Sequence, residues 1–124
     1  MDISQNNHND GDQHWGNALW VREYLAARPR PMNTVKTYGA DGSRYGKTDD
    51  HGLSRVFRHV LAGLASARFH RPESGLGLNA RSEAAIRAVR KMETLVRAWE
   101  RSPRMELLEE REPDEAYAAA GEKG

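Results

Sequence analysis

The stretch LSRVFRHVLAGL, residues 53–64, decides the fold that we predict for this chain. Its apolar residues recur at steps of three and one, which is the period of one helical face. These residues are Leu53, Val56, Phe57, Val60, Leu61 and Leu64. Asp49 or Asp50 can cap the start of this helix, and Pro72 ends it, because the residue before a proline avoids the helical conformation. We therefore expect a helix that runs to Pro72 and buries its apolar stripe.

Two further helices flank this one in the sequence. The first covers residues 15–28, where Ala18, Val21 and Leu25 share one face and a proline follows. The second covers residues 82–101 and ends before another proline. Its apolar face is formed by Ile86, Val89, Met92, Val96 and Trp99. Residues 32–48 are rich in glycine and polar side chains, so they are expected to form a loop or at best a short irregular strand.

The predicted fold class is all-α, a small helical domain of three to four helices that occupies residues 15–113. Residues 1–14 and 114–124 lack periodic apolar positions, so we expect them to be disordered acidic ends that folding does not require. A chain this small is not expected to bury the apolar surface of three tryptophans, Trp15, Trp20 and Trp99. A homo-oligomer is therefore expected.

The charge is distributed unevenly along the chain. Residues 15–104 carry 17 Lys or Arg and 8 Asp or Glu, whereas both ends are acidic. A basic middle suits an anionic ligand such as a nucleotide, a nucleic acid or an acidic protein face; solvated helix faces are the plainer explanation. The chain has no cysteine and no stretch near the ~20 apolar residues that span a bilayer. We expect a cytoplasmic protein without a membrane partner.

The candidate phosphate-binding residues lie on the predicted central helix. Arg55, Arg58 and His59 stand next to one another or one turn apart on its polar side, which gathers positive charge at one place. Arginine presents a planar fork of donors to phosphate oxygens, and a neighbouring histidine can bind phosphate or carry a proton. The alternative is that these side chains are solvated and contribute little to folding.

Two carboxylates are candidate ligands for Mg²⁺. Glu73 follows the predicted central helix, and Glu93 lies at the border of the apolar face of the next helix. Arg97 stands four residues after Glu93, so an ordinary pair within the helix also explains that glutamate. Glu93 alone does not make a metal site.

Three runs of this sequence resemble the small dATP/dGTP diphosphohydrolase domain found in many phage genomes: TYGADGSRYG at 37–46, LSRVFRHVLAGL at 53–64 and PESGL at 72–76. The resemblance implies an all-α fold that acts on nucleoside triphosphates with a divalent metal. The positions that match the family pattern are Arg58, His59, Glu73 and Ser74.

The sequence also departs from that family pattern. Arg71 stands where an acid is expected, and the histidine pair expected after Leu76 is missing. The matching positions suffice to hold a phosphate but support hydrolysis poorly. Three functions therefore compete: binding or cleavage of a nucleoside triphosphate, non-catalytic binding of a host protein by a phage inhibitor, and nucleic-acid binding. The last is least favoured, because no aromatic stacking residues alternate with the basic ones.

Overall fold

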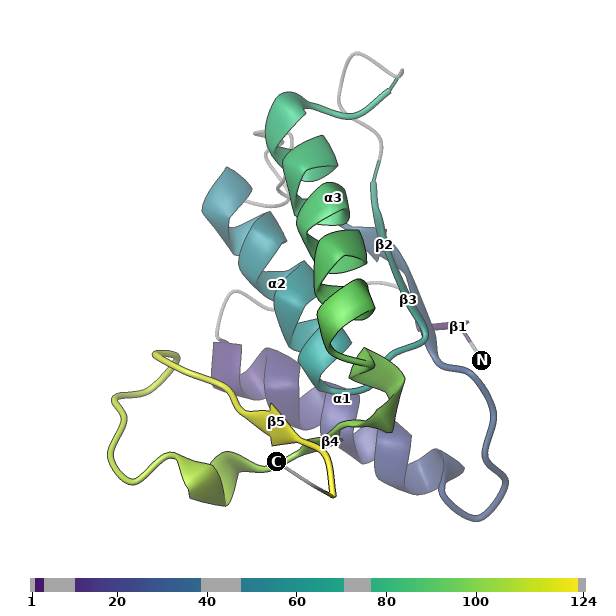
Figure 1. Ribbon diagram of the computed structural model, residues 1–124, viewed down its shortest axis with the longest axis vertical. Coiled ribbons are helices and arrows are strands. Elements are labelled where there is room, and N and C mark those ends of the chain that lie inside the picture. Colours follow the sequence, from purple (N-terminus) through teal and green to yellow (C-terminus); the bar gives the residue numbers. More distant parts are fainter. Residues whose placement is uncertain (1, 4–10, 39–47, 71–76, 123–124) are drawn as a thin grey trace.

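The computed structural model of the protein describes residues 2–3, 11–38, 48–70 and 77–122. Figure 1 shows the course of the chain and the places of its helices and strands. In chain order the elements are β1 (Asp2–Ile3), α1 (Gly11–Leu25), β2 (Asn33–Thr37), α2 (Asp49–Leu61), β3 (Ser66–Phe69), α3 (Ala80–Leu95), the 3₁₀ turn Ala98–Glu100, β4 (Ser102–Pro103), the 3₁₀ turn Met105–Leu107 and β5 (Ala119–Ala120).

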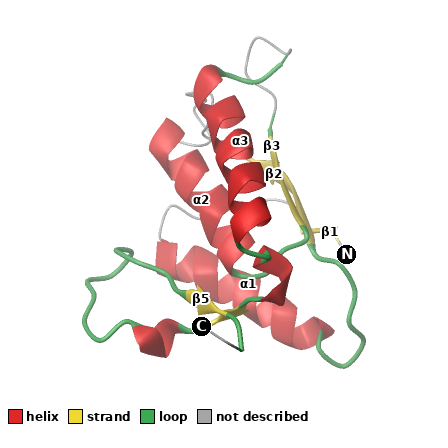
Figure 2. Ribbon diagram, in the orientation of Figure 1, coloured by secondary structure: helices red, strands yellow, loops and turns green. Residues whose placement is uncertain are grey.

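The fold is mixed α/β, and the all-α prediction is wrong. The strands β1, β2 and β3 form a parallel sheet in that order, in which Asn33 pairs with Asp2 on one side and with Ser66 on the other. The strands β4 and β5 pair antiparallel in a second, smaller sheet. Figure 2 shows the parallel sheet beside the helices. Each parallel connection contains a helix, α1 between β1 and β2 and α2 between β2 and β3, as parallel pairing requires.

The helix α2 ends well before Pro72, contrary to the prediction. Gly63 adopts φ +83°, a left-handed conformation that glycine provides at helix ends. The chain then extends into β3, which pairs with β2. The other end of α2 also differs from the prediction, because Thr48 rather than Asp49 or Asp50 caps it, by accepting a hydrogen bond from the His51 amide at 3.3 Å.

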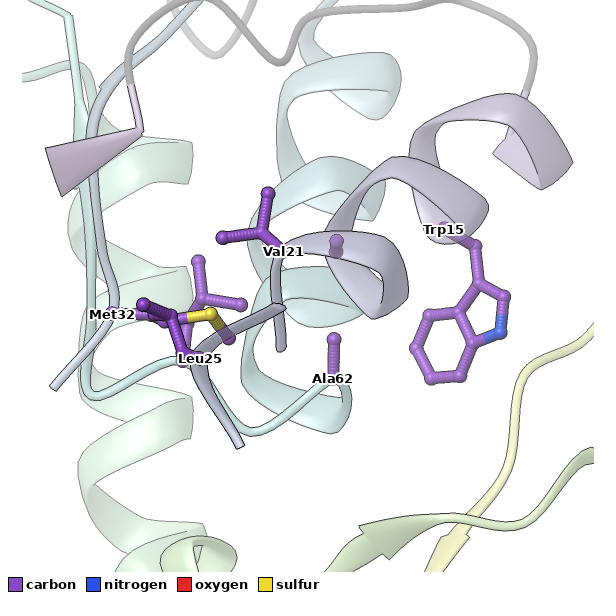
Figure 3. Close-up of a cluster of buried hydrophobic side chains, with 7 residues drawn as sticks. Trp15, Val21, Leu25, Met32 and Ala62 are labelled. Carbon is purple, nitrogen blue, oxygen red and sulfur yellow. The ribbon is translucent and has the colours of Figure 1, made fainter. Parts of the chain in front are cut away.

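The main apolar core joins α1 to the end of α2 and to the chain before β2. Its buried members are Trp15, Ala18, Val21, Leu25, Met32, Ala62 and Leu64. Figure 3 shows this cluster between the ribbons. The face predicted for the first helix is therefore buried as expected. A smaller core of Val56, Phe69 and Ala85 joins α2, β3 and α3. In Figure 1 the helix α3 lies beside α2.

Both predicted boundaries of the helical domain differ from the structure. The helix α1 begins at Gly11, four residues inside the segment expected to be disordered. Beyond Asp114, the Tyr117 ring lies 5.1 Å from the Trp15 ring, centroid to centroid, and β5 follows. The helix α3 ends at Leu95 rather than Arg101. Among the described helices, none has the length and apolar character needed to cross a membrane.

Candidate anion-binding site

One contact of the candidate site lies at the carboxyl end of β2. Parallel strands point their carboxyl ends to the same edge of the sheet, and ligands of α/β proteins bind outside that edge. In chain order α2 follows β2 and α3 follows β3. Arg55 Nη1 donates to the carbonyl oxygen of Tyr38, just after β2, at 2.8 Å. The Tyr38 ring in turn contacts the His70 ring just after β3.

The three basic residues predicted to stand on the polar side of α2 are buried. Arg55 and His59 are 0% exposed and Arg58 is 8% exposed. The alternative of solvated side chains does not hold, because the first turn of α1 covers Arg58 and His59, and Tyr117 additionally covers Arg58. The residue of α1 that contacts Arg58 and His59 is His14, itself fully buried.

These side chains form a compact basic cluster, which we define as His14, Arg55, Arg58 and His59. Arg58 Nε donates to His14 Nδ1 at 3.2 Å, and the rings of His14 and His59 lie 4.4 Å apart. Both ring nitrogens of His59 are buried and find no hydrogen-bond partner in the described part of the chain. Burial, together with the charges of Arg58 and Arg55, lowers the pKa of His59 to about 3. Its imidazole is therefore neutral at physiological pH.

A second group of contacts surrounds the first turn of α1. The Asp12 amide donates to Asp114 Oδ1 at 2.6 Å, which brings a carboxylate to the positive end of the helix. The Asp12 carboxylate accepts a hydrogen bond from the Tyr117 hydroxyl at 3.0 Å and pairs with Arg111 at 3.0 Å. The hydrogen bond from Arg111 lowers the pKa of Asp12, while burial, followed by the bond to Asp12, raises the pKa of Tyr117 to about 12.

A cleft of about 420 Å³, the Arg58 cleft, opens between α2 and residues 114–117. Its apolar lining includes Leu53, Phe57 and Leu61. Its polar lining includes Arg58, Asp114 and Tyr117. The guanidinium carbon of Arg58 lies 5.3 Å from the centre of the Tyr117 ring. No carboxylate forms an ion pair with Arg58 within the residues described.

The remaining predicted residues do not join this site. Glu73 and Ser74 lie outside the described residues. Glu93 is exposed on α3. No three His, Asp or Glu side chains of the described ranges converge as metal ligands.

Sequence reasoning missed His14, Asp114 and Tyr117, because it assigned all three to disordered ends. A signal was present in the sequence: Trp15, Ala18 and His14 follow helical spacing, so the apolar period extends back toward Gly11. Comparison of the chain with protein-family models, curated proteins and solved structures finds no match.

Proposed function

We propose that the protein binds a nucleoside triphosphate or a similar phosphorylated ligand in the Arg58 cleft. The observation that carries this proposal is Arg58, a residue 8% exposed that lines the cleft and has no ion-paired carboxylate among the described residues. A buried charge without a partner is costly, and an anionic ligand supplies that partner. Arginine matches the oxygen geometry of phosphate through its planar fork of donors.

The composition of the cleft favours a nucleotide over a simple anion. Leu53, Phe57 and Leu61 give the α2 wall of the cleft an apolar surface, and Arg58 adds a positive charge to the same wall, across from Asp114 and Glu115. Ligand sites commonly combine an apolar lining with a few placed polar groups. A base or sugar fits the apolar side while the phosphates face Arg58. The cleft also lies close to the start of α1, because Asp114 lines the cleft and accepts a hydrogen bond from the Asp12 amide, and the helix dipole favours anions there.

The proposal also includes hydrolysis of the bound triphosphate. The neutral His59 is 0% exposed and stands beside Arg58, so it is positioned within the cluster rather than at the surface of the cleft. Mg²⁺ would enter with the triphosphate, and Glu73 is its proposed protein ligand on the sequence pattern, whereas Glu93 on α3 does not line the cleft. Release of pyrophosphate in the presence of Mg²⁺ tests turnover in the same samples as binding.

A second candidate function is the binding of a host protein, or of another copy of the chain, through the outer face of α1. Trp20 and Tyr24 are 64% and 65% exposed there, and their rings stack with centroids 5.7 Å apart. Exposed aromatic side chains of this size are enriched in protein interfaces. Replacing both by serine and measuring the mass in solution by light scattering tests this candidate. Nucleic acid is the least favoured partner.

Thermal unfolding with ATP, dATP, dGTP and pyrophosphate, each with and without Mg²⁺, tests the main proposal. A ligand at 100 times its Kd stabilises the native state by about 2.7 kcal/mol, so the melting temperature should rise. Arg58→Met should lose this rise. The matched control is Arg87→Met, because Arg87 is exposed on α3, where its side chain pairs with Glu83. A failure of every ligand to shift the melting temperature of the unmodified chain would remove the proposal.

A further inference from the structure

We propose that the place held by the Asp114 carboxylate, at the first turn of α1, is the phosphate subsite of the Arg58 cleft, and that Asp114 is an internal occupant which a phosphate group displaces. This inference rests on the proposed function and deepens it. It assigns the position of one phosphate group. It also makes residues 111–117, the 111–117 segment, a competitor for that position.

Gly11 marks the centre of the subsite. A Cβ atom at this first residue of α1 would lie 2.7 Å from Arg58 Nη1 and 3.2 Å from Asp114 Oδ1, and it would also clash with the Tyr117 hydroxyl. A guanidinium nitrogen, a carboxylate oxygen and a phenol therefore converge on one backbone position that carries no side chain. Glycine lets these three groups approach the backbone closely.

The subsite has two hydrogen-bond donors that suit an anion, the Asp12 amide and the Arg58 guanidinium. The Asp12 amide belongs to the first turn of α1, where backbone N–H groups have no partner within the helix, and it donates to Asp114 Oδ1. Arg58 provides an independent sign of a missing ligand. Its side chain is buried and its Nε bonds to His14, but its Nη atoms make no hydrogen bond to any described residue although Nη1 lies against Gly11. A phosphate oxygen can accept from both donors at once.

The Asp114 carboxylate is a weak competitor for this position. Asp114 adopts φ +65° and is the one non-glycine residue with positive φ in the described chain, a conformation that is unfavourable for most residues and less so for Asp. Its side chain carries a single negative charge, whereas a phosphate group carries about two at pH 7 and offers three strong acceptor oxygens. The 111–117 segment stays attached through Arg111 and Tyr117, which both bond to the Asp12 carboxylate.

Isothermal titration of the full chain with ATP and with pyrophosphate tests the inference. Asp114→Asn removes the competing charge while keeping a residue that tolerates positive φ. We expect this variant to bind about tenfold more tightly than the unmodified chain, equivalent to about 1.4 kcal/mol. Glu115→Gln is the matched control, because Glu115 also lines the cleft and its carboxylate bonds to the Glu112 amide instead. It should change the Kd less than twofold.

Hydrogen exchange of the 111–117 segment gives a second readout. Displacement of Asp114 by the ligand should speed amide exchange in this segment, whereas a ligand that binds beneath an undisturbed segment should slow it. If the unmodified chain binds and Arg58→Met does not, but Asp114→Asn leaves the Kd and the exchange unchanged, the subsite is wrong and the proposed function stands. If neither the unmodified chain nor Asp114→Asn binds either probe, the proposed function and the subsite both fail.

Discussion

Arg58 Nε and His14 Nδ1 lie 3.2 Å apart in the protein interior, and this hydrogen bond joins the last turn of α2 to the first turn of α1. Because Nδ1 accepts a hydrogen bond from the guanidinium, the ring hydrogen of His14 in this pair lies on Nε2. The pair explains why a positively charged side chain is held inside the fold. It also places the guanidinium of Arg58 at the start of a helix.

Removal of His14 should destabilise the protein. His14→Ala deletes a fully buried ring and leaves Arg58 without its acceptor, so we expect a loss of about 2–4 kcal/mol in the free energy of unfolding. Chemical denaturation at pH 7.5 measures it. A loss below about 0.5 kcal/mol, the range of ordinary surface substitutions, would contradict the buried pair.

The stability of the protein should fall as the pH is lowered from about 6.5 towards 3, because of His59. Burial lowers the pKa of His59 to about 3 in the folded protein. Between pH 6.5 and pH 3, therefore, His59 takes up a proton only in the unfolded chain. The slope is at most about 1.4 kcal/mol per pH unit, and stability is insensitive to His59 above pH 7.

The variant His59→Gln isolates that dependence, since every other titrating group, His14 included, remains in both proteins. Between pH 6.5 and 5 the unmodified chain should lose about 2 kcal/mol more than the variant. Denaturation curves collected at fixed ionic strength in this range provide the measurement. Parallel pH profiles for the two proteins would show that His59 protonates in the folded state as readily as in the unfolded one.

Two glycines of α1 should respond oppositely to alanine. At Gly16 a Cβ atom meets nothing within 4 Å, so Gly16→Ala should stabilise the protein by about 0.5–1 kcal/mol through helix propensity. At Gly11 the same change pushes away Arg58 Nη1 and the Tyr117 hydroxyl, so that gain should be lost and nucleotide binding should weaken. Thermal unfolding with and without ATP compares the two variants. Equal melting temperatures of the two variants, with and without ATP, would show that the groups around Gly11 do not constrain that position.

Tyr117 should contribute to stability although it lies in a segment that the sequence predicts to be disordered. Its ring packs on Trp15 and its hydroxyl bonds to Asp12. We expect Tyr117→Phe to cost about 1 kcal/mol for the lost hydrogen bond, and Tyr117→Ala to cost more because the aromatic contact is also lost. A chain that ends at Pro113 should behave like Tyr117→Ala. If the shorter chain has the same melting temperature as the full chain, the domain boundary predicted from the sequence is right.

The sequence allowed the helices to be predicted but not the sheet. Helices are specified by local periodicity, and α1, α2 and α3 each lie largely within a predicted helix. Strand β3 pairs with β2 across a whole helix, so nothing near residues 66–69 indicates a partner. Gly63 was the local sign that α2 stops, yet a glycine inside an apolar stripe is also compatible with a continuing helix.

The candidate site was only partly predictable for a related reason. Arg55, Arg58 and His59 were identified by their chemistry, since their spacing on one helix is local information. Their burial depends on His14 and Tyr117, which approach from distant parts of the chain. Charged residues are ordinarily exposed, so the sequence favoured a solvated face. Tertiary contacts at both ends of the chain reversed that expectation.

The central position of β2 in the parallel sheet also has a consequence for the order of folding. Asn33 pairs with Asp2 and Ser66, so both ladders of this sheet close over long stretches of chain. Such closures slow folding, because entropy is lost before the contacts form. During synthesis β2 leaves the ribosome before its partner β3 and must wait, with one edge unpaired, until residues 66–69 emerge. In that interval the exposed edge is open to other extended chains, so the nascent protein is most prone to aggregation just before β3 appears.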